Sequence, residues 1–160
     1  MSVDVYRLSV LSPTDSAYEV FGRATSLVCN RLMASWKIEM NVALAAIEVL
    51  SGLAKVKLTA PNILMCKRTV NWICEFIMYQ CSRPAPAHSK DLHSMICAAF
   101  QCLVLWLTEH DYLMQDKQCL QAVLEVVELG ISGTRSQVSG AILWSHSEVL
   151  FDAVYMIPFC

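Results

Sequence analysis

The segment Leu92–Thr108 constrains the fold most strongly, because 17 consecutive residues carry no charge and their apolar side chains recur with the period of an α-helix. A helix over about Asp91–Thr108 presents one apolar stripe, made of Leu92, Met95, Ile96, Ala99, Leu103, Trp106 and Leu107. A membrane span needs about 18 or more apolar residues, and this run includes the polar His93 and Gln101. We therefore predict a buried helix and no integral membrane segment.

Several other segments share this helical character, and none needs a strand, because Asn-Gly and Asp-Gly hairpin turns are absent. A first helix can begin at Ser12-Pro13, with proline at its first position, or at the capping box formed by Ser16 and Glu19. Its predicted apolar face is Val20, Ala24, Leu27, Val28 and Leu32. Further helices are expected to start at Ser35, Pro61, about Asp116 and about Ala141. The sequence thus predicts an all-α fold with about six helices.

The predicted helices come in successive pairs that end near residues 53, 108 and 156. Periods of about 40–47 residues are typical of HEAT and armadillo repeats, so we predict a HEAT/armadillo-like segment over residues 1–137. A closed helical bundle is the alternative. Residues 138–160 are expected to form a divergent apolar C-terminal helix. Their uncapped apolar end suggests a fragment or a truncated or alternative terminus.

The composition limits the classes of function. The chain has 160 residues, 56% of them hydrophobic, and a formal net charge of −2 with no dense basic patch, which argues against nucleic-acid binding. Eight cysteines lie within apolar helical runs, where free cysteine behaves as a small buried hydrophobe. The N-terminus lacks the basic start and apolar core of a signal peptide. These features predict a cytoplasmic protein whose surplus apolar surface contacts a partner.

The segment Cys81–Cys102 is the one place where potential metal ligands or a reactive thiol gather. The candidate residues in and near it are Cys74, Cys81, His88, His93, Cys97 and Cys102. His93 and Cys97 are four residues apart on one helix face, whereas Cys102 is about 140° further round the helix. No paired C-x₂-C occurs, and Cys97 lies inside an apolar helix rather than at an activated position. A zinc- or thiol-dependent enzyme is thus the alternative hypothesis, beside a membrane-associated helical protein.

No other pattern indicates catalysis. The chain has no G-x-S-x-G elbow, and its five glycines form no phosphate-binding loop. We therefore predict that the protein is not an enzyme and that it has no catalytic, cofactor-binding or metal-binding residues. Trp36 and Trp72 are candidate partner contacts, because tryptophan often anchors protein interfaces.

Three longer stretches carry a family resemblance: Leu27–Lys57, Tyr79–His110 and Cys119–Gln137, together with residues 1–25. They are similar to the beta subunits of Ral GTPase-activating proteins. Residues 58–78 and the residues after about Gln137 depart from that pattern. The matching stretches contain no functional-site motif, so no catalytic residue is carried over.

The resemblance implies a non-catalytic regulatory or scaffold subunit. In that family the beta subunit pairs with a catalytic alpha subunit, whose tuberin-like domain uses an asparagine to promote GTP hydrolysis on Ral small GTPases. The resemblance therefore implies a heterodimer in Ral signalling, with the alpha subunit as the direct partner and Ral as an indirect one.

Overall fold

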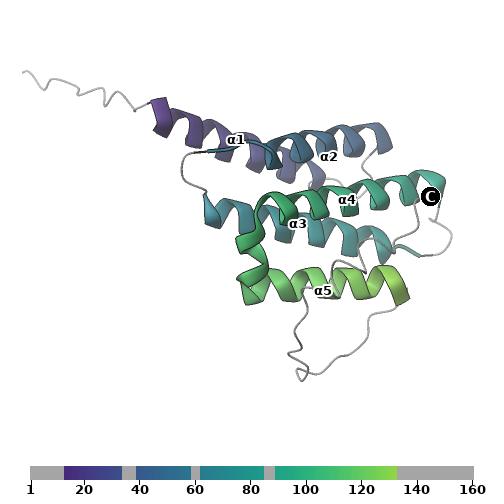
Figure 1. Ribbon diagram of the computed structural model, residues 1–160. Coiled ribbons are helices and arrows are strands. Elements are labelled where there is room, and N and C mark those ends of the chain that lie inside the picture. Colours follow the sequence, from purple (N-terminus) through teal and green to yellow (C-terminus); the bar gives the residue numbers. More distant parts are fainter. Residues whose placement is uncertain (1–12, 34–38, 59–61, 85–88, 133–160) are drawn as a thin grey trace, which may run out of the picture.

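A computed structural model of the chain describes residues 13–33, 39–58, 62–84 and 89–132. Within these ranges the chain forms five α-helices, one short 3-10 helix and no strand. The elements in chain order are α1 (Pro13–Met33), α2 (Met40–Ala54), α3 (Ile63–Cys81), α4 (Lys90–Glu109), η2 (Asp111–Gln115) and α5 (Lys117–Ser132) (Figure 1). The all-α prediction is confirmed.

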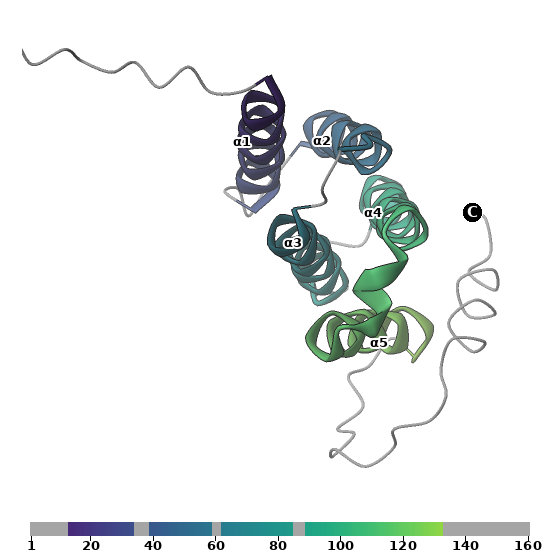
Figure 2. The same cartoon turned by 60° about the vertical axis from the view of Figure 1, so that its left-hand side comes forward.

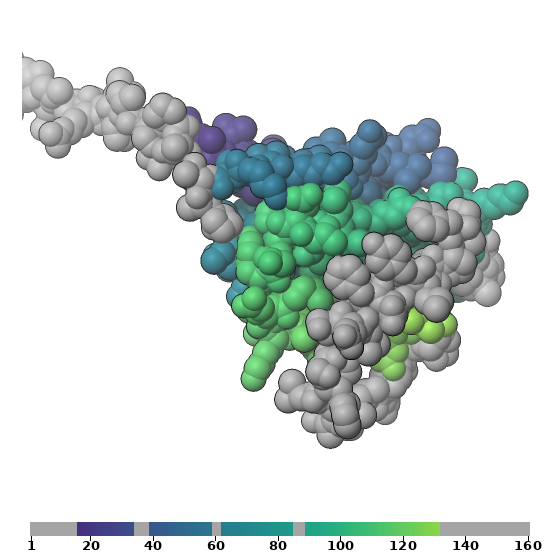
Figure 3. Space-filling view, viewed as in Figure 1, coloured from purple at the N-terminus to yellow at the C-terminus, as the bar shows by residue number. Residues whose placement is uncertain are grey.

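The helices are arranged in two layers (Figure 2). One layer holds α1, α3 and α5, and the other holds α2 and α4. The most extensive contacts are those of α2 with α4, and α4 packs next most closely on α3. The space-filling view shows side chains of α2 lying directly against those of α4 (Figure 3). Each helix thus packs mainly on helices one or two places away along the chain.

Local sequence signals explain where several helices begin. The Asn62 side chain accepts a hydrogen bond from the Met65 N–H and caps α3. Ser89 does the same for α4 through the Leu92 N–H. The carboxylate of Asp116 accepts from the Cys119 N–H at the start of α5. Of the two predicted starts of the first helix, the structure selects the one with Pro13 at its first position.

The core runs through the space between the two layers. Its largest fully buried apolar side chains are Trp106, Leu50, Ile77, Leu103 and Leu113. The stripe predicted for α4 is largely confirmed, because Leu92, Met95, Ala99, Leu103 and Trp106 are all buried. Partly buried side chains such as Ile96 and Leu107 pack at the edge of this core.

The predicted face of α1 is only partly correct, because Leu32 is buried and Val28 packs against the core, but two of its other members are exposed. Val20 and Leu27 are 66% and 69% exposed, whereas Phe21, Thr25 and Cys29 are buried. The helix carries two adjacent strips with helical spacing, and the structure buries the one that includes a threonine and a cysteine. Thr25 is accommodated there because its hydroxyl donates to the carbonyl of Phe21, four residues earlier.

Two predictions about organisation are not tested. The two-layer arrangement does not by itself distinguish a HEAT or armadillo repeat from another helical assembly, so the repeat type stays a prediction. The predicted C-terminal helix over 138–160 lies outside the described residues, as does the boundary at 137.

Candidate functional site

The predicted Cys/His cluster does not form a common site. His93 is exposed and Cys97 is half-buried one turn further along α4, while Cys102 is buried. His88 lies outside the described residues. Among the residues that are described, no group of three His, Cys, Asp or Glu side chains is placed to hold a metal ion. The cluster therefore separates into two buried cysteines, Cys74 and Cys102, two half-buried ones, Cys81 and Cys97, and one exposed histidine.

The buried thiols are expected to be unreactive. Burial raises the pKa of Cys74 to about 12, with the neighbouring Cys119 adding to the effect. Burial likewise raises the pKa of Cys102 to about 11. A thiol with such a pKa is protonated at neutral pH and is a poor nucleophile. These cysteines act as small apolar side chains in the core.

The α4 helix is the one helix, among the residues described, with the length and mean hydropathy of a membrane span. In the structure its apolar stripe is buried against α2 and α3. This packing is typical of a core helix, and no observation here supports the membrane-associated alternative.

The two tryptophans predicted as partner contacts have different outcomes. Trp36 lies outside the described residues. Trp72 is half-buried on α3 and packs against the edge of the core. It keeps some of its ring accessible, and its role as a partner contact stays a prediction.

The most elaborate polar arrangement lies where α4 crosses the end of α2. The indole N–H of Trp106 donates to the carbonyl oxygen of Leu50 over 3.1 Å, although the two residues are 56 apart in the chain. One turn further along α4, the imidazole of His110 stacks on the Trp106 indole with ring centroids 5.2 Å apart. The pair fixes the position of α4 against the last turn of α2.

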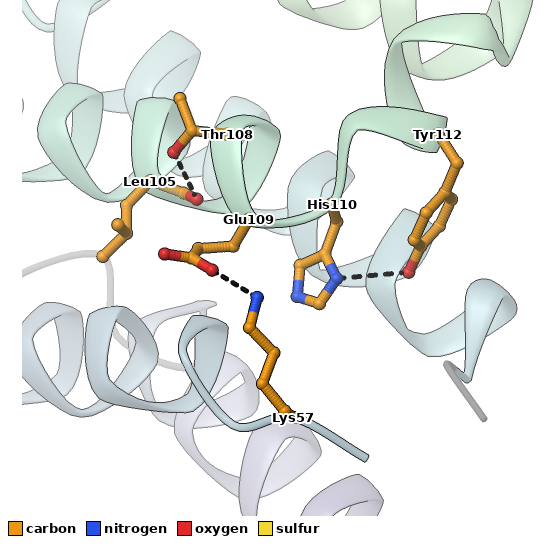
Figure 4. A network of polar contacts seen from close by, with 6 residues as sticks. All are labelled: Lys57, Leu105, Thr108, Glu109, His110 and Tyr112. Carbon is orange, nitrogen blue, oxygen red and sulfur yellow. Dashed lines mark hydrogen bonds and ion pairs between the residues drawn. The ribbon is translucent and has the colours of Figure 1, made fainter. Parts of the chain in front are cut away.

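His110 continues this arrangement toward η2 and α3 (Figure 4). Its Nδ1 is 3.4 Å from the hydroxyl of Tyr112, which in turn is close enough to Cys66 to influence the pKa values of both groups. His110 is only 8% exposed, and its Nε2 has no hydrogen-bond partner among the described residues. Burial and the nearby Lys57 lower the pKa of His110, while the Ala54 carbonyl opposes them. The ring is therefore mainly neutral at pH 7.

A small cavity of about 180 Å³ lies beside these residues. Its lining is Phe21, Val56, Lys57, Leu58, Asn62, Cys66, Glu109, His110 and Tyr112. Lys57 and Glu109 form an ion pair at its rim, which lowers the pKa of Glu109. Burial raises the pKa values of Tyr112 and Cys66, so both are neutral. The cavity is smaller than typical ligand pockets of roughly 300–1,000 Å³. The cavity and the polar residues around it therefore join helices of the fold and offer no activated nucleophile.

An apolar surface on α1 and the start of α3 is the better candidate for binding. Leu27 and Val20 project from α1, and Ile63 and Leu64 are 48% and 60% exposed at the start of α3. Leu27 also lines a shallow groove of about 520 Å³, whose other lining residues are mostly polar: Tyr18, Glu19, Gly22, Arg23, Ser26, Asn30, Asn62 and Met65. We call Val20, Leu27, Ile63 and Leu64, with this groove, the α1–α3 surface. Large apolar side chains that remain exposed are candidates for contacts with a partner protein.

Sequence reasoning missed both features. For the Trp106–His110 contact the sequence offers only the spacing of four residues, which brings side chains to the same side of a helix. The α1–α3 surface was missed because Val20 and Leu27 were assigned to the core. The one available signal was the second strip of helical spacing on α1, through Phe21 and Cys29.

The described part of the chain is thus all-helical. It has a polar junction, made of Leu50, Cys66, Trp106, His110 and Tyr112, an exposed apolar surface and no catalytic cluster. Over 126 residues the chain is 55% identical to the Ral GTPase-activating protein subunit beta of rat and of mouse, and over 124 residues to that of human. The family resemblance seen in the sequence is confirmed over this stretch.

The matched stretch covers 79% of this chain and only 8% of the rat protein, so the chain corresponds to a short segment of these relatives. No protein-family model matches the chain. No solved structure matches it either.

Proposed function

We propose that this chain is a non-catalytic, regulatory helical segment that pairs with a catalytic alpha subunit and so supports GTPase activation of Ral small GTPases. The observation that carries the proposal is the 55% identity, over 126 residues, to proteins named as beta subunits of a Ral GTPase-activating protein. The name "subunit" implies a partner chain. A cytoplasmic location is part of the same proposal, supported by the free thiols of the seven cysteines within the described residues.

The structure supports a binding role in two ways. First, the described residues show buried, protonated thiols and only a small cavity beside His110, rather than an activated nucleophile or base. Second, the α1–α3 surface leaves Leu27 and Leu64 more than half exposed. Burying two such side chains stabilises a complex by roughly 1.5–3 kcal/mol each, before the costs of association. We assign the alpha-subunit contact to this surface.

The test is co-purification of the full chain with the alpha subunit, followed by measurement of Ral-GTP hydrolysis. Leu27→Asp and Leu64→Asp are expected to weaken association at least tenfold, because each places a charge in the apolar contact. Ile131→Asp is the matched control. Ile131 is 69% exposed, as Leu27 is, but it lies on α5, at the opposite end from α1 of the layer that the two helices share.

Retention of full affinity by both α1–α3 variants would show that the contact lies elsewhere. If the unmodified chain binds no alpha subunit and leaves the hydrolysis rate unchanged, the proposed function itself is wrong.

A further inference from the structure

The α5 helix carries an apolar stripe that runs out of the core onto an open surface. Leu120, Leu124, Val127 and Ile131 follow one another at intervals of four, three and four residues, so they share one face of the helix. Val127 is buried, Leu120 and Leu124 are half-buried, and Ile131 is 69% exposed. The stripe is therefore only partly covered, and its C-terminal end is the least covered.

The neighbouring flank of α4 extends this apolar surface. Phe100 lies against the end of α5, so closely that a methyl group added to Gly130 would be 3.0 Å from the Phe100 ring. Cys97 and Val104 are three residues before and four after Phe100, on the same side of α4, and both are half-buried. We call this flank and the α5 stripe together the α4–α5 edge.

The layer arrangement gives this edge a clear place in the fold. Within the described residues, α3 packs on α1, α4 and α5, whereas α5 packs mainly on α3 and η2 and stands at the end of its layer (Figure 2). A further helix in the second layer, next to α4, would cover the exposed end of the α5 stripe. The side chains already present there are apolar and uncharged, which suits an amphipathic helix.

The sequence that follows α5 has the matching pattern. On a helix over residues 141–157, Leu143, Leu150, Val154 and Ile157 lie on one face at intervals of seven, four and three residues. Glu148 and Asp152 fall on the opposite face. This places the two acidic residues away from an apolar contact and toward solvent.

The connection between α5 and residues 141–157 is long enough for that segment to fold back on the α4–α5 edge. Eight residues, 133–140, separate the end of α5 from this segment, and their sequence is GTRSQVSG. Connections between neighbouring helices commonly have about two to eight residues. At roughly 3.5 Å per extended residue the connection can span about 28 Å, which is enough to turn the chain back along α5.

We propose that residues 141–157 dock as an amphipathic helix on the α4–α5 edge of their own chain, with Leu150 and Ile157 among the side chains that cover Ile131 and Leu124. The occupant is intramolecular because it begins only eight residues beyond the surface that it fits. The proposal is independent of the proposed function, since it concerns a different edge of the fold.

Hydrogen–deuterium exchange on the full chain tests the proposal. Backbone amides of residues 143–157 are expected to exchange at least tenfold more slowly than the same amides in Leu150→Asp. Ile131→Asp, which changes only the proposed receiving surface, is expected to abolish the protection as well. Leu27→Asp, with the same exposure as Ile131, and Asp152→Asn, on the opposite face of the segment, are the controls and should leave the protection unchanged.

Three outcomes would overturn the proposal. The first is protection that survives Ile131→Asp, and the second is no protection in the unmodified chain. The third is protection that increases with protein concentration together with a dimer mass in light scattering, which would identify the segment of a second copy as the occupant. Leu150→Asp lies outside the described core, so circular dichroism of this variant should show the helices of that core unchanged.

Discussion

The indole N–H of Trp106 reaches the carbonyl oxygen of Leu50 across the interface of α2 and α4, with an N–O distance of 3.1 Å. Both residues are fully buried, so water cannot replace this hydrogen bond. The contact ties the middle of the chain to its N-terminal half. It makes Trp106 a sensitive position for testing the fold.

We expect Trp106→Phe to lower the free energy of unfolding by about 1–3 kcal/mol, because it removes the donor and part of the buried ring. Trp106→Ala should cost about 3–5 kcal/mol, since it also leaves a cavity. Urea denaturation followed by circular dichroism measures both values. Trp72→Phe is the control, because Trp72 is only half-buried, and its effect should be smaller. Equal losses for the two Phe variants would mean that the Leu50 contact contributes little.

His110 predicts a dependence of stability on pH. Burial lowers its pKa in the folded chain below the unfolded value of about 6.5, so the unfolded chain binds more protons as the pH falls. The contribution of His110 is therefore fully present above pH 6.5 and is lost progressively below it. In His110→Gln the fall in unfolding free energy between pH 7.5 and 5.5 should be smaller than in the unmodified chain. Urea titrations at the two pH values give the comparison, and parallel curves for both proteins would contradict it.

The cysteines are expected to differ in their reactivity toward iodoacetamide. At pH 8, Cys74 and Cys102 should remain unmodified in the folded chain, because burial both shields them and raises the pKa of each thiol to about 11 or above. Half-buried Cys97 and Cys81 should be labelled first. Peptide mass spectrometry after timed quenching reports each site, with Cys97→Ser as the control. Labelling of Cys97 faster than that of a free thiol would instead favour the thiol-enzyme hypothesis.

Two helical glycines offer a matched pair of substitutions. A methyl group added at Gly52 meets no atom within 4 Å, so Gly52→Ala should stabilise α2 by about 0.5–1 kcal/mol through its better helix propensity. At Gly130 the added methyl group would be 3.0 Å from the Phe100 ring, which has to shift. Gly130→Ala should therefore be neutral or destabilising. The unfolding temperatures of the two variants test this prediction. An equal rise in both would show that the Phe100 ring moves without an energetic cost.

Most helix positions could be predicted from the sequence because their signals are local, although α2 begins at Met40, five residues after the predicted start. Pro13, Ser89 and Asp116 mark helix starts through their own side chains, and the apolar period of Leu92–Thr108 defines α4 almost to the residue. The rotation of α1 could not be predicted in the same way. Periodicity identifies residues that share a face, but which of two neighbouring strips is buried depends on the helices that pack against it.

The contacts of the polar junction could not be predicted from the sequence either, and the reason is related. It joins Leu50, Cys66, Trp106, His110 and Tyr112, and the contacts between helices are set by packing rather than by spacing along the chain. The absence of a shared Cys/His cluster was partly foreseeable. The angle between Cys97 and Cys102 on one helix already separated them, whereas the exposure of His93 required the structure.

The pairing of each helix with near neighbours along the chain has a consequence for how the protein opens. Contacts of short sequence separation favour rapid folding and let an outer helix detach while the remainder keeps its own contacts. α3 has a neighbour on each side in its layer and also packs on α4, whereas α1 and α5 stand at the two ends of that layer. Thermal fluctuations should therefore release α1 or α5 before the α3–α4 pair, so that the exposed surface of α1 belongs to one of the more adaptable parts of the described chain.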